Sequence, residues 1–348
     1  MTQNYEYELN RAAYILVNEM FRLKAGETLV ITADTQSDMR VVDAVAAAAF
    51  TAGALPMVIT LPSPLGVGKA ADPMLPLQPL IGALLGADAW VEFNKQWLLY
   101  SSPFERAMAE NKKLRYMCLV EMTVDMMVRL IGRIDTALLA TFLHHVAGMT
   151  QKARNMRITT PAGNDLSFKM LSERVVACED GLCTTPGMHF LAGQISFMPD
   201  FDSICGTLVF DGTIAPPCGF LQQPVVLEVE SGVVRKIRGG RQADELRSWL
   251  ERFEDPNMFR VAHGAYGFNP GARLCGNVLE DERIWGCTEW GLGYLSPLDA
   301  PPHGIPAKSH MDGICLNSSV WLDDVQILEN GNVIHPLLKP MAEQLLRG

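Results

Sequence analysis

The sequence predicts an α/β domain over residues 1–153 followed by a β-rich domain over residues 154–348. Three observations favour this division. Helical and strand patterns alternate through the first 150 residues, which is typical of a parallel sheet covered by helices. After Arg154 short apolar runs separated by turn residues replace that alternation. The histidines and carboxylates with the strongest functional pattern lie in this second part.

Apolar periodicity and chain breakers mark the elements of the first part. Apolar residues recur at helical spacing from Ala12 to Leu23, and an alanine-rich run from 38 to 52 stops at Gly53. Ser37 is the expected cap of that second helix. The Pro- and Gly-rich stretch 61–79 is a long connection, which places it at the surface or at the rim of a site. Further expected elements are strands at 28–32, 56–60, 89–93 and 116–120, a helix at 102–112, and two helices up to 154.

The second part begins with a hairpin, in which strands 156–160 and 166–170 flank the turn 161–164. One helix, at 243–253, interrupts the strands that follow. The glycine-rich fingerprints of dinucleotide and nucleoside triphosphate sites are missing from the sequence. The remaining strands are expected at 206–211, 225–230, 233–238, 259–268, 285–293, 308–316 and 320–334.

Composition narrows the class of partner. The net charge of −10 argues against nucleic acid and anionic membranes, and no apolar run approaches the roughly 20 residues that span a bilayer. The eight cysteines form no CxxC pair, which argues against a disulfide framework or a zinc-thiolate site. The acidic, polar first residues do not resemble a signal peptide. We expect a cytoplasmic protein with a small-molecule substrate.

His310 and Asp312 are the strongest candidates for chemistry. They lie two residues apart in a predicted strand, so both side chains leave the same face. His263 lies in a second strand that becomes glycine-rich at the histidine, where the backbone can approach a ligand closely. Two imidazoles and one carboxylate form the facial arrangement that holds non-haem Fe(II) and leaves open positions.

Glu289 and Tyr294 follow one another in a strand rich in apolar residues and glycine. A carboxylate buried there must be paired, metal-bound or protonated, so Glu289 is a candidate for the same centre. Tyr294 is a candidate hydrogen-bond donor. His189 precedes a glycine turn and a strand, and it is either a general acid–base or a structural loop histidine. Ser101, with Pro103, is explained fully as the start of a helix.

These motifs follow one another in an order that resembles the aminopeptidase T family of metallopeptidases, and within it the 2,5-dihydroxypyridine 5,6-dioxygenases more closely. The resemblance covers most of 155–335 and the α/β part only in outline. It implies an α/β part, a β-rich metal-binding part and a homodimer or higher homo-oligomer. The segments that carry it are 206–211, 226–232, 237–240, 255–256, 263–270 and 310–312.

The resemblance also implies roles for single residues. Gln194 and His263 stand where the peptidases carry metal-binding glutamates, and this pattern favours one iron held by His263, His310 and Asp312. Glu289 stands where the peptidases carry a metal-binding histidine, so it is either a fourth ligand or a hydrogen-bond partner of a ligand. His189 matches a dioxygenase histidine, whereas Ser101 replaces another. We expect catalytic roles for His189 and Tyr294 and substrate contacts from Tyr100, Ser101 and Phe220.

The expected function is therefore an Fe(II)-dependent, extradiol-like ring-cleaving dioxygenase acting with O2 on a hydroxylated N-heteroaromatic such as 2,5-dihydroxypyridine. The alternative is a metallohydrolase, an aminopeptidase or amidase, that keeps Glu289, Tyr294, His310 and Asp312 as ligands of zinc, manganese or cobalt. A third hypothesis is a protein that binds metal only structurally.

Overall fold

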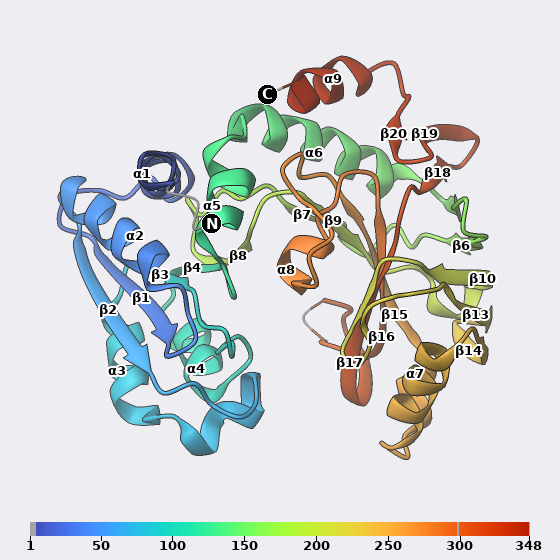
Figure 1. The fold of residues 1–348 in the computed structure, drawn as a ribbon, viewed down its shortest axis with the longest axis horizontal. Coiled ribbons are helices and arrows are strands. Elements are labelled where there is room, and N and C mark those ends of the chain that lie inside the picture. Colours follow the sequence, from blue (N-terminus) through green and yellow to red (C-terminus); the bar gives the residue numbers. More distant parts are fainter. Residues whose placement is uncertain (1–4, 298, 348) are drawn as a thin grey trace. The chain divides into compact units, whose positions relative to one another are not determined.

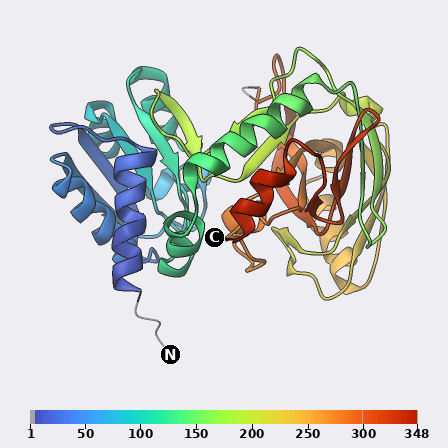
Figure 2. The same cartoon turned by 90° about the horizontal axis from the view of Figure 1, so that it is seen from above.

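The structure, a computed structural model, describes residues 5–297 and 299–347. The chain divides into two compact units. Unit 1 contains residues 1–136 and 179–192, and unit 2 contains residues 137–178 and 193–348. The strand content matches the predicted fold class, an α/β part and a β-rich part, which the ribbons of Figures 1 and 2 show. The predicted domain boundary at residue 153 stays a prediction. By packing, unit 1 ends at residue 136 and also includes residues 179–192.

Unit 1 is built on a five-stranded sheet in the order β2-β1-β3-β4-β8. All neighbouring strands pair in parallel, as the alternating pattern predicts. The fifth strand, β8, comes from residues far along the chain and was not expected. The strands of the five-stranded sheet are β1 (Thr28–Asp34), β2 (Leu55–Leu61), β3 (Ala89–Glu92), β4 (Arg115–Cys118) and β8 (Gly187–Phe190).

Part of the stretch 61–79, which the sequence predicts to be a long connection, is helical, because it contains a 3-10 helix and the first residues of α3. Asp38, rather than the expected Ser37, caps α2 by accepting from the backbone N–H of Arg40. Ser37 instead donates to the carbonyl of Phe93 at the end of β3. The helices are α1 (Glu6–Ile15), α2 (Met39–Thr51), α3 (Leu77–Gly86), α4 (Ser102–Glu110) and α5 (Val124–Met127), with π-helical turns at Leu16–Met20 and Val128–Gly132 and a 3-10 helix at Gly68–Met74.

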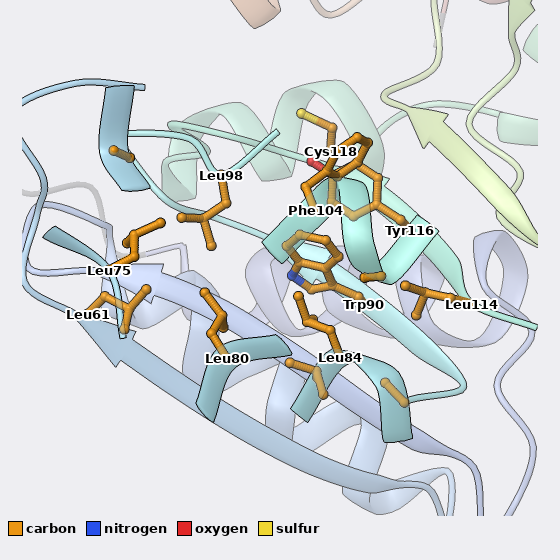
Figure 3. Close-up of a cluster of buried hydrophobic side chains, with 14 of the residues drawn as sticks. Leu61, Leu75, Leu80, Leu84, Trp90, Leu98, Phe104, Leu114, Tyr116 and Cys118 are labelled. Atoms are coloured by element: carbon orange, nitrogen blue, oxygen red, sulfur yellow. The ribbon is translucent and has the colours of Figure 1, made fainter. Parts of the chain in front are cut away.

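A cluster of buried side chains between this sheet and its helices forms part of the core of unit 1. Trp90 lies at its centre with its ring 4.4 Å from that of Tyr116, and Phe104 of α4 packs 5.1 Å from Tyr116 (Figure 3). Aromatic pairs at these separations add to the free energy of simple apolar burial. The cluster packs against β3 and β4 through Trp90 and Tyr116.

Ser101 has the structural role that the sequence predicts, since its Oγ accepts from the N–H of Phe104 at the start of α4. We expect Ser101→Ala to lower the free energy of unfolding by about 1 kcal/mol, the usual cost of losing such a cap. Urea denaturation measures this difference. An unchanged free energy of unfolding would contradict the capping role.

Unit 2 contains an eight-stranded sheet in the order β14-β13-β10-β6-β5-β18-β19-β20 and a seven-stranded sheet in the order β12-β11-β17-β16-β15-β9-β7. The predicted hairpin is confirmed as β5 (Asn155–Thr159) and β6 (Asp165–Lys169). The other strands of the larger sheet are β10 (Cys205–Phe210), β13 (Val225–Glu230), β14 (Val233–Arg238), β18 (Ser319–Leu322), β19 (Val325–Glu329) and β20 (Asn332–Val333).

The seven-stranded sheet packs one face against the eight-stranded sheet. Phe168 of β6 lies 5.4 Å from Trp290 and 5.9 Å from Phe197, which project from neighbouring positions of the smaller sheet. The opposite face of the smaller sheet therefore points away from this layer. The strands of the seven-stranded sheet are β7 (Ala177–Glu179), β9 (Gln194–Phe197), β11 (Thr213–Ala215), β12 (Gly219–Phe220), β15 (Val261–Gly267), β16 (Thr288–Leu295) and β17 (Ile305–Cys315).

Helices complete unit 2. The long helix α6 (Thr136–Lys152) runs beside the sheets (Figure 2), and its Phe142 stacks 5.4 Å from Trp285 and packs 5.2 Å from Phe268. The predicted helix at 243–253 is found as α7 (Arg241–Glu251), and α8 (Val278–Asp281) and α9 (Lys339–Arg347) complete the set of α-helices within the described residues of this unit. In the part of the chain that the structure describes, no helix has the length and apolarity needed to cross a bilayer.

Candidate metal centre

Three adjacent antiparallel strands of unit 2 bring the predicted ligands together. His263 on β15 lies opposite Gly291 on β16, and Gly291 lies opposite Asp312 on β17. Residues directly opposite one another project from the same face of a sheet, as do residues two apart in one strand. His310 and Glu289, each two residues from this row, therefore share its face. That face is the one turned away from the eight-stranded sheet.

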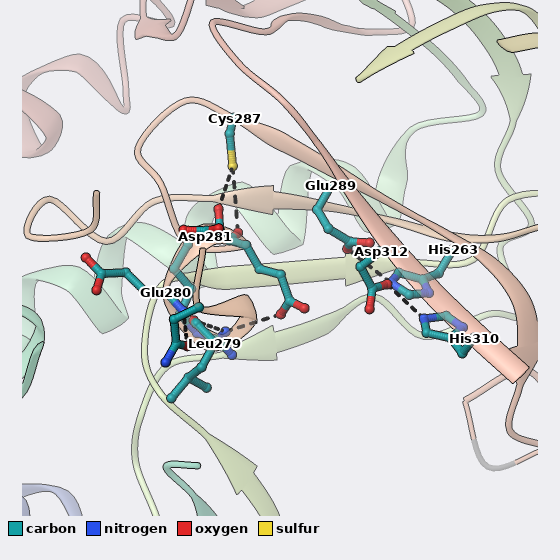
Figure 4. Close-up of polar contacts among 11 residues, drawn as sticks. His263, Leu279, Glu280, Asp281, Cys287, Glu289, His310 and Asp312 are labelled. Atoms are coloured by element: carbon teal, nitrogen blue, oxygen red, sulfur yellow. Dashed lines mark hydrogen bonds and ion pairs between the residues drawn. The ribbon is translucent and has the colours of Figure 1, made fainter. Parts of the chain in front are cut away.

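The donor atoms converge closely enough to hold one ion. One ligand atom from each of His263, His310 and Asp312 lies within 4.8 Å of the others, the one such group among residues 5–297 and 299–347 (Figure 4). The two imidazole rings are stacked, with centroids 5.2 Å apart and planes 9° apart. Asp312 Oδ1 lies 2.8 Å from His310 Nε2 and 3.7 Å from His263 Nε2. The predicted convergence of these three residues, which come from two distant segments of the chain, is thus found in the structure.

The backbone selects which ring nitrogen of His310 faces the centre. His310 Nδ1 lies 2.6 Å from the carbonyl oxygen of Tyr294, which can only accept a hydrogen bond. Nδ1 therefore carries the proton and Nε2 is left to coordinate, which is the arrangement usual for metal-binding histidines.

Glu289 lies beside the three candidate ligands and is fully buried. Its Oε2 is 3.0 Å from His263 Nε2, and it also forms a side-chain hydrogen bond with Asp312. The carboxylate is thus near enough to be a fourth ligand or to orient His263. These are the two roles, fourth ligand or hydrogen-bond partner of a ligand, that the sequence predicts as alternatives for Glu289.

The electrostatics of the site favour an ionised Asp312 beside a protonated partner. Burial disfavours the charge of Asp312, but the charge and hydrogen bond of His310 lead the effects that lower its pKa to about 2. Burial lowers the pKa of His310, whereas the charge and hydrogen bond of Asp312 raise it, and the net shift is upward. A divalent cation would take the place of the imidazole proton as the positive charge that this carboxylate requires.

Gly291 makes the convergence of the imidazoles possible. A Cβ built on Gly291 would lie 2.4 Å from Cε1 of His263 and 2.7 Å from Cε1 of His310. Both distances are shorter than real Cβ contacts, so only glycine fits between the two rings at the middle strand. Gly291 belongs to the glycine-rich strand that carries Glu289, and no motif in the sequence assigns it this role. The strand register supplies that role.

Asp299 is a further carboxylate that interacts electrostatically with the two histidines. It lies in the loop between β16 and β17, where its N–H donates to the carbonyl of Ser296. Burial raises the pKa of Asp299, and the charges of His263 and His310 act against this rise. The loop is anchored by Ala300, which packs in one cluster with Ala262, the neighbour of His263. No motif marks Asp299 in the sequence.

The other predicted site residues lie on several elements, some in unit 1 and some in unit 2. Tyr294 contacts His310 through its carbonyl oxygen, and its side chain is 42% exposed. Phe220 lies on β12 of the same sheet, with its ring against Gly276. His189 belongs to unit 1, on β8, where its Nε2 lies 2.8 Å from the carbonyl oxygen of Thr185. Tyr100 and Ser101 also belong to unit 1, and their contacts with a substrate stay predictions.

Replacing Glu289 with glutamine tests its part in the centre. Glu289→Gln keeps the side-chain volume but removes the charge next to His263, so we expect metal affinity to fall by about 10- to 100-fold, as when a partner of a ligand is lost. Competition titration with a fluorescent chelator measures the affinity. Metal binding as tight as that of the unchanged protein would show that Glu289 neither ligates nor orients a ligand.

The fold and the site together define a protein of the aminopeptidase T fold with a candidate mononuclear centre of two histidines and one carboxylate. The particular family follows from the sequence, because the profile of the 2,5-dihydroxypyridine 5,6-dioxygenase family matches residues 12–290. The chain belongs to this family, as the resemblance predicted.

Known relatives agree with this assignment. The chain is 28% identical over 198 residues to the 2,5-dihydroxypyridine 5,6-dioxygenase of Pseudomonas putida, a match that spans 54% of this chain and 56% of the relative. The solved structure of 2,5-dihydroxypyridine dioxygenase from Pseudomonas putida KT2440 has the same fold, with a TM-score of 0.80, 21% identity and coverage of 97% of this chain and 100% of that one. AmpT from Thermus thermophilus shares the fold more distantly, with a TM-score of 0.66, 14% identity and coverage of 95% and 100%.

Proposed function

We propose that this protein is an Fe(II)-dependent ring-cleaving dioxygenase whose substrate is 2,5-dihydroxypyridine or a closely related hydroxylated N-heteroaromatic. The observation that carries the proposal is the convergence of His263, His310 and Asp312 on one face of three adjacent strands. Membership of the dioxygenase family supports the same reaction class.

The residues present fit a single iron better than a pair of metal ions. Two imidazoles and one carboxylate form the facial set that non-haem Fe(II) prefers, and His310 already has its Nδ1 occupied by a carbonyl. Gln194 lies on β9 of the same sheet, and its neutral amide cannot supply the charge that a carboxylate bridging two metals would. When bound, Fe(II) supplies the redox chemistry through which O2 reacts with an aromatic diol.

The protein's own residues would bind and deprotonate the substrate. We assign the acceptance of the hydroxyl proton to His189, because a neutral imidazole has a ring nitrogen that can accept a proton. Tyr100, Ser101 and Phe220 would contact the heteroaromatic ring, and the side chain of Tyr294 would donate a hydrogen bond to it. Because Ser101 stands where we expect a histidine in the dioxygenases, the substrate of this chain can differ in its substituents from 2,5-dihydroxypyridine.

We also propose a cytoplasmic homodimer or higher homo-oligomer. None of the eight cysteines, all of which lie within the described residues, is in a disulfide, which suits a reducing compartment. Light scattering coupled to gel filtration measures the oligomeric state, and a single species of 38.3 kDa would contradict the oligomer.

Aerobic turnover with defined metals tests the function. The protein is stripped of metal, reloaded with either Fe(II) or Zn(II), and mixed with 2,5-dihydroxypyridine while ring absorbance and dissolved O2 are followed. We expect loss of both signals with Fe(II) and of neither with Zn(II). Hydrolysis of amide or peptide substrates by the zinc form, without any O2 uptake by the iron form, would support the metallohydrolase instead.

A further inference from the structure

A buried carboxylate in unit 1 lies outside the chemistry assigned so far. Glu92 is the last residue of β3 and is fully buried, with Thr32 of β1 and Cys118 of β4 as its neighbours in the sheet. Burying a carboxylate is costly unless hydrogen bonds compensate, so its partners indicate what the position is for.

Those partners are mostly backbone groups of one irregular segment. Glu92 accepts hydrogen bonds from the backbone N–H groups of Leu98 and Leu99, and the hydroxyl of Tyr116 donates to its Oε2 over 2.5 Å. Leu98 and Tyr116 both belong to the apolar cluster of Figure 3. The carboxylate therefore ties the segment 95–101, which joins β3 to α4, to the end of the sheet.

Two further contacts fix the same segment. The N–H of Gln96 donates to Asp34 Oδ2 at the end of β1 over 2.8 Å, and the N–H of Gly68 donates to the carbonyl of Trp97 over 2.9 Å. The segment has no helical or strand hydrogen bonds of its own over residues 95–99. Its conformation is thus set by groups outside it, with Glu92 supplying two of the bonds.

The segment ends in the two residues to which we assigned substrate contacts. Tyr100 has a φ of +66°, in the left-handed region that residues other than glycine rarely adopt. Such a conformation persists only where the surroundings impose it, and it is often found at ligand sites. The next residue, Ser101, donates its N–H to the carbonyl of Leu98, directly beside the bonds to Glu92.

We propose that Glu92 is a positioning residue for the reaction: its buried carboxylate holds the 95–101 segment in the conformation that presents the exposed Tyr100 to the substrate. The inference rests on the proposed function for the substrate contacts, whereas the hold on the segment is independent of that function. Glu92 would not touch the substrate and would act through the segment.

Because Glu92 ionises, opening of the 95–101 segment is expected to depend on pH. Burial raises the pKa of Glu92 to about 7, against the hydrogen bonds from Tyr116, Leu98 and Leu99, and the nearby charge of Asp34 acts in the same direction as burial. Cys118, hydrogen-bonded to Tyr116, is the other titratable group of this cluster. When the segment opens and Glu92 meets water, its pKa returns to the ordinary 4.5. The closed segment therefore binds the proton more tightly, so raising the pH from 4.5 to 7 favours opening.

Hydrogen exchange of the iron-loaded protein tests the proposal, with wild type compared with Glu92→Gln, Glu92→Ala and the exposed control Glu110→Gln on α4. After correction for intrinsic rates, we expect protection of peptide 95–101 to be about twentyfold greater at pH 5.5 than at pH 7.5 in wild type, from the two pKa values. The ratio should be near one in Glu92→Gln and unchanged in Glu110→Gln. Glu92→Ala should lose protection at both pH values.

Steady-state kinetics with 2,5-dihydroxypyridine complete the test. We expect the KM of Glu92→Ala to rise at least tenfold with a smaller change in kcat, and Glu92→Gln to restore it. Wild-type protection in Glu92→Ala, or lost protection with an unchanged KM, would overturn the proposal. If Glu92→Ala does not fold, an equal pH ratio in wild type and Glu92→Gln overturns it. A protein that turns over no diol refutes the proposed function, while the exchange data still decide whether Glu92 holds the segment.

Discussion

Gly291→Ala is expected to abolish metal binding at the candidate centre and with it the oxygen chemistry. The added methyl group would lie 2.4 Å from the ring of His263 and 2.7 Å from that of His310, so both imidazoles must move. Displacing two of three ligands leaves no facial set, because ligand positions must be kept within about 0.5 Å of the productive geometry. We expect less than about 1% of wild-type kcat/KM, a loss of at least about 2.7 kcal/mol in transition-state stabilisation. Metal content after dialysis and turnover with added Fe(II) measure the effect.

Gly148→Ala on α6 is the matched control for that substitution. A Cβ at Gly148 meets nothing within 4 Å, so the change should preserve metal content and activity and stabilise the helix slightly. Circular dichroism separates loss of the site from loss of the fold. Gly291→Ala protein that binds iron and turns over substrate like wild type would show that the two imidazoles do not act together.

Asp312→Asn is expected to have an effect of similar size through charge rather than shape. The amide fills the same space 2.8 Å from His310 but cannot neutralise a cation held by two neutral imidazoles. We expect metal affinity and kcat/KM to fall at least about a hundredfold. Removing a residue that only hydrogen-bonds to a metal ligand already lowers affinity by up to about a hundredfold, and Asp312 is proposed to bind the metal itself.

Asp324→Asn serves as the control for Asp312→Asn, because Asp324 is an exposed carboxylate in the turn between β18 and β19. It should bind iron like the unchanged protein. Calorimetric titration with Fe(II) under anaerobic conditions compares the three proteins. Equal affinities for Asp312→Asn and wild type would remove Asp312 from the ligand set.

Local pattern was enough to predict most elements of the fold. Period-two runs bounded by turn residues predicted β5, β6, β13 and β14 within one residue of their bounds. The sequence failed where the decisive partner is remote. Strand β8 is only four residues long and becomes a strand because it extends the sheet of unit 1 beside β4. The cap of α2 passed from Ser37 to Asp38 because Ser37 Oγ lies between Asp34 and Phe93, a contact across 56 residues of sequence.

The ligands were easier to predict than their surroundings. His310 and Asp312 are two apart in one strand, and strand geometry alone places them on one face. The glycine-rich strand around His263 made it a third candidate and the resemblance supported it. Only the register of β15, β16 and β17 explains why it lies in one row with Gly291 and Asp312. Gly291 was missed because its role depends on the histidines of the two neighbouring strands. A glycine can be recognised as necessary at that position only once the strand register is known.

Isotope labelling tests the central claim most directly. The iron-loaded protein is given 2,5-dihydroxypyridine under ¹⁸O2 in ordinary water, and the ring-opened product is analysed by mass spectrometry after short reaction times. A dioxygenase at the His263–His310–Asp312 centre predicts that both atoms of one O2 molecule enter the product. A product whose new oxygen comes only from water would contradict the account and indicate hydrolysis.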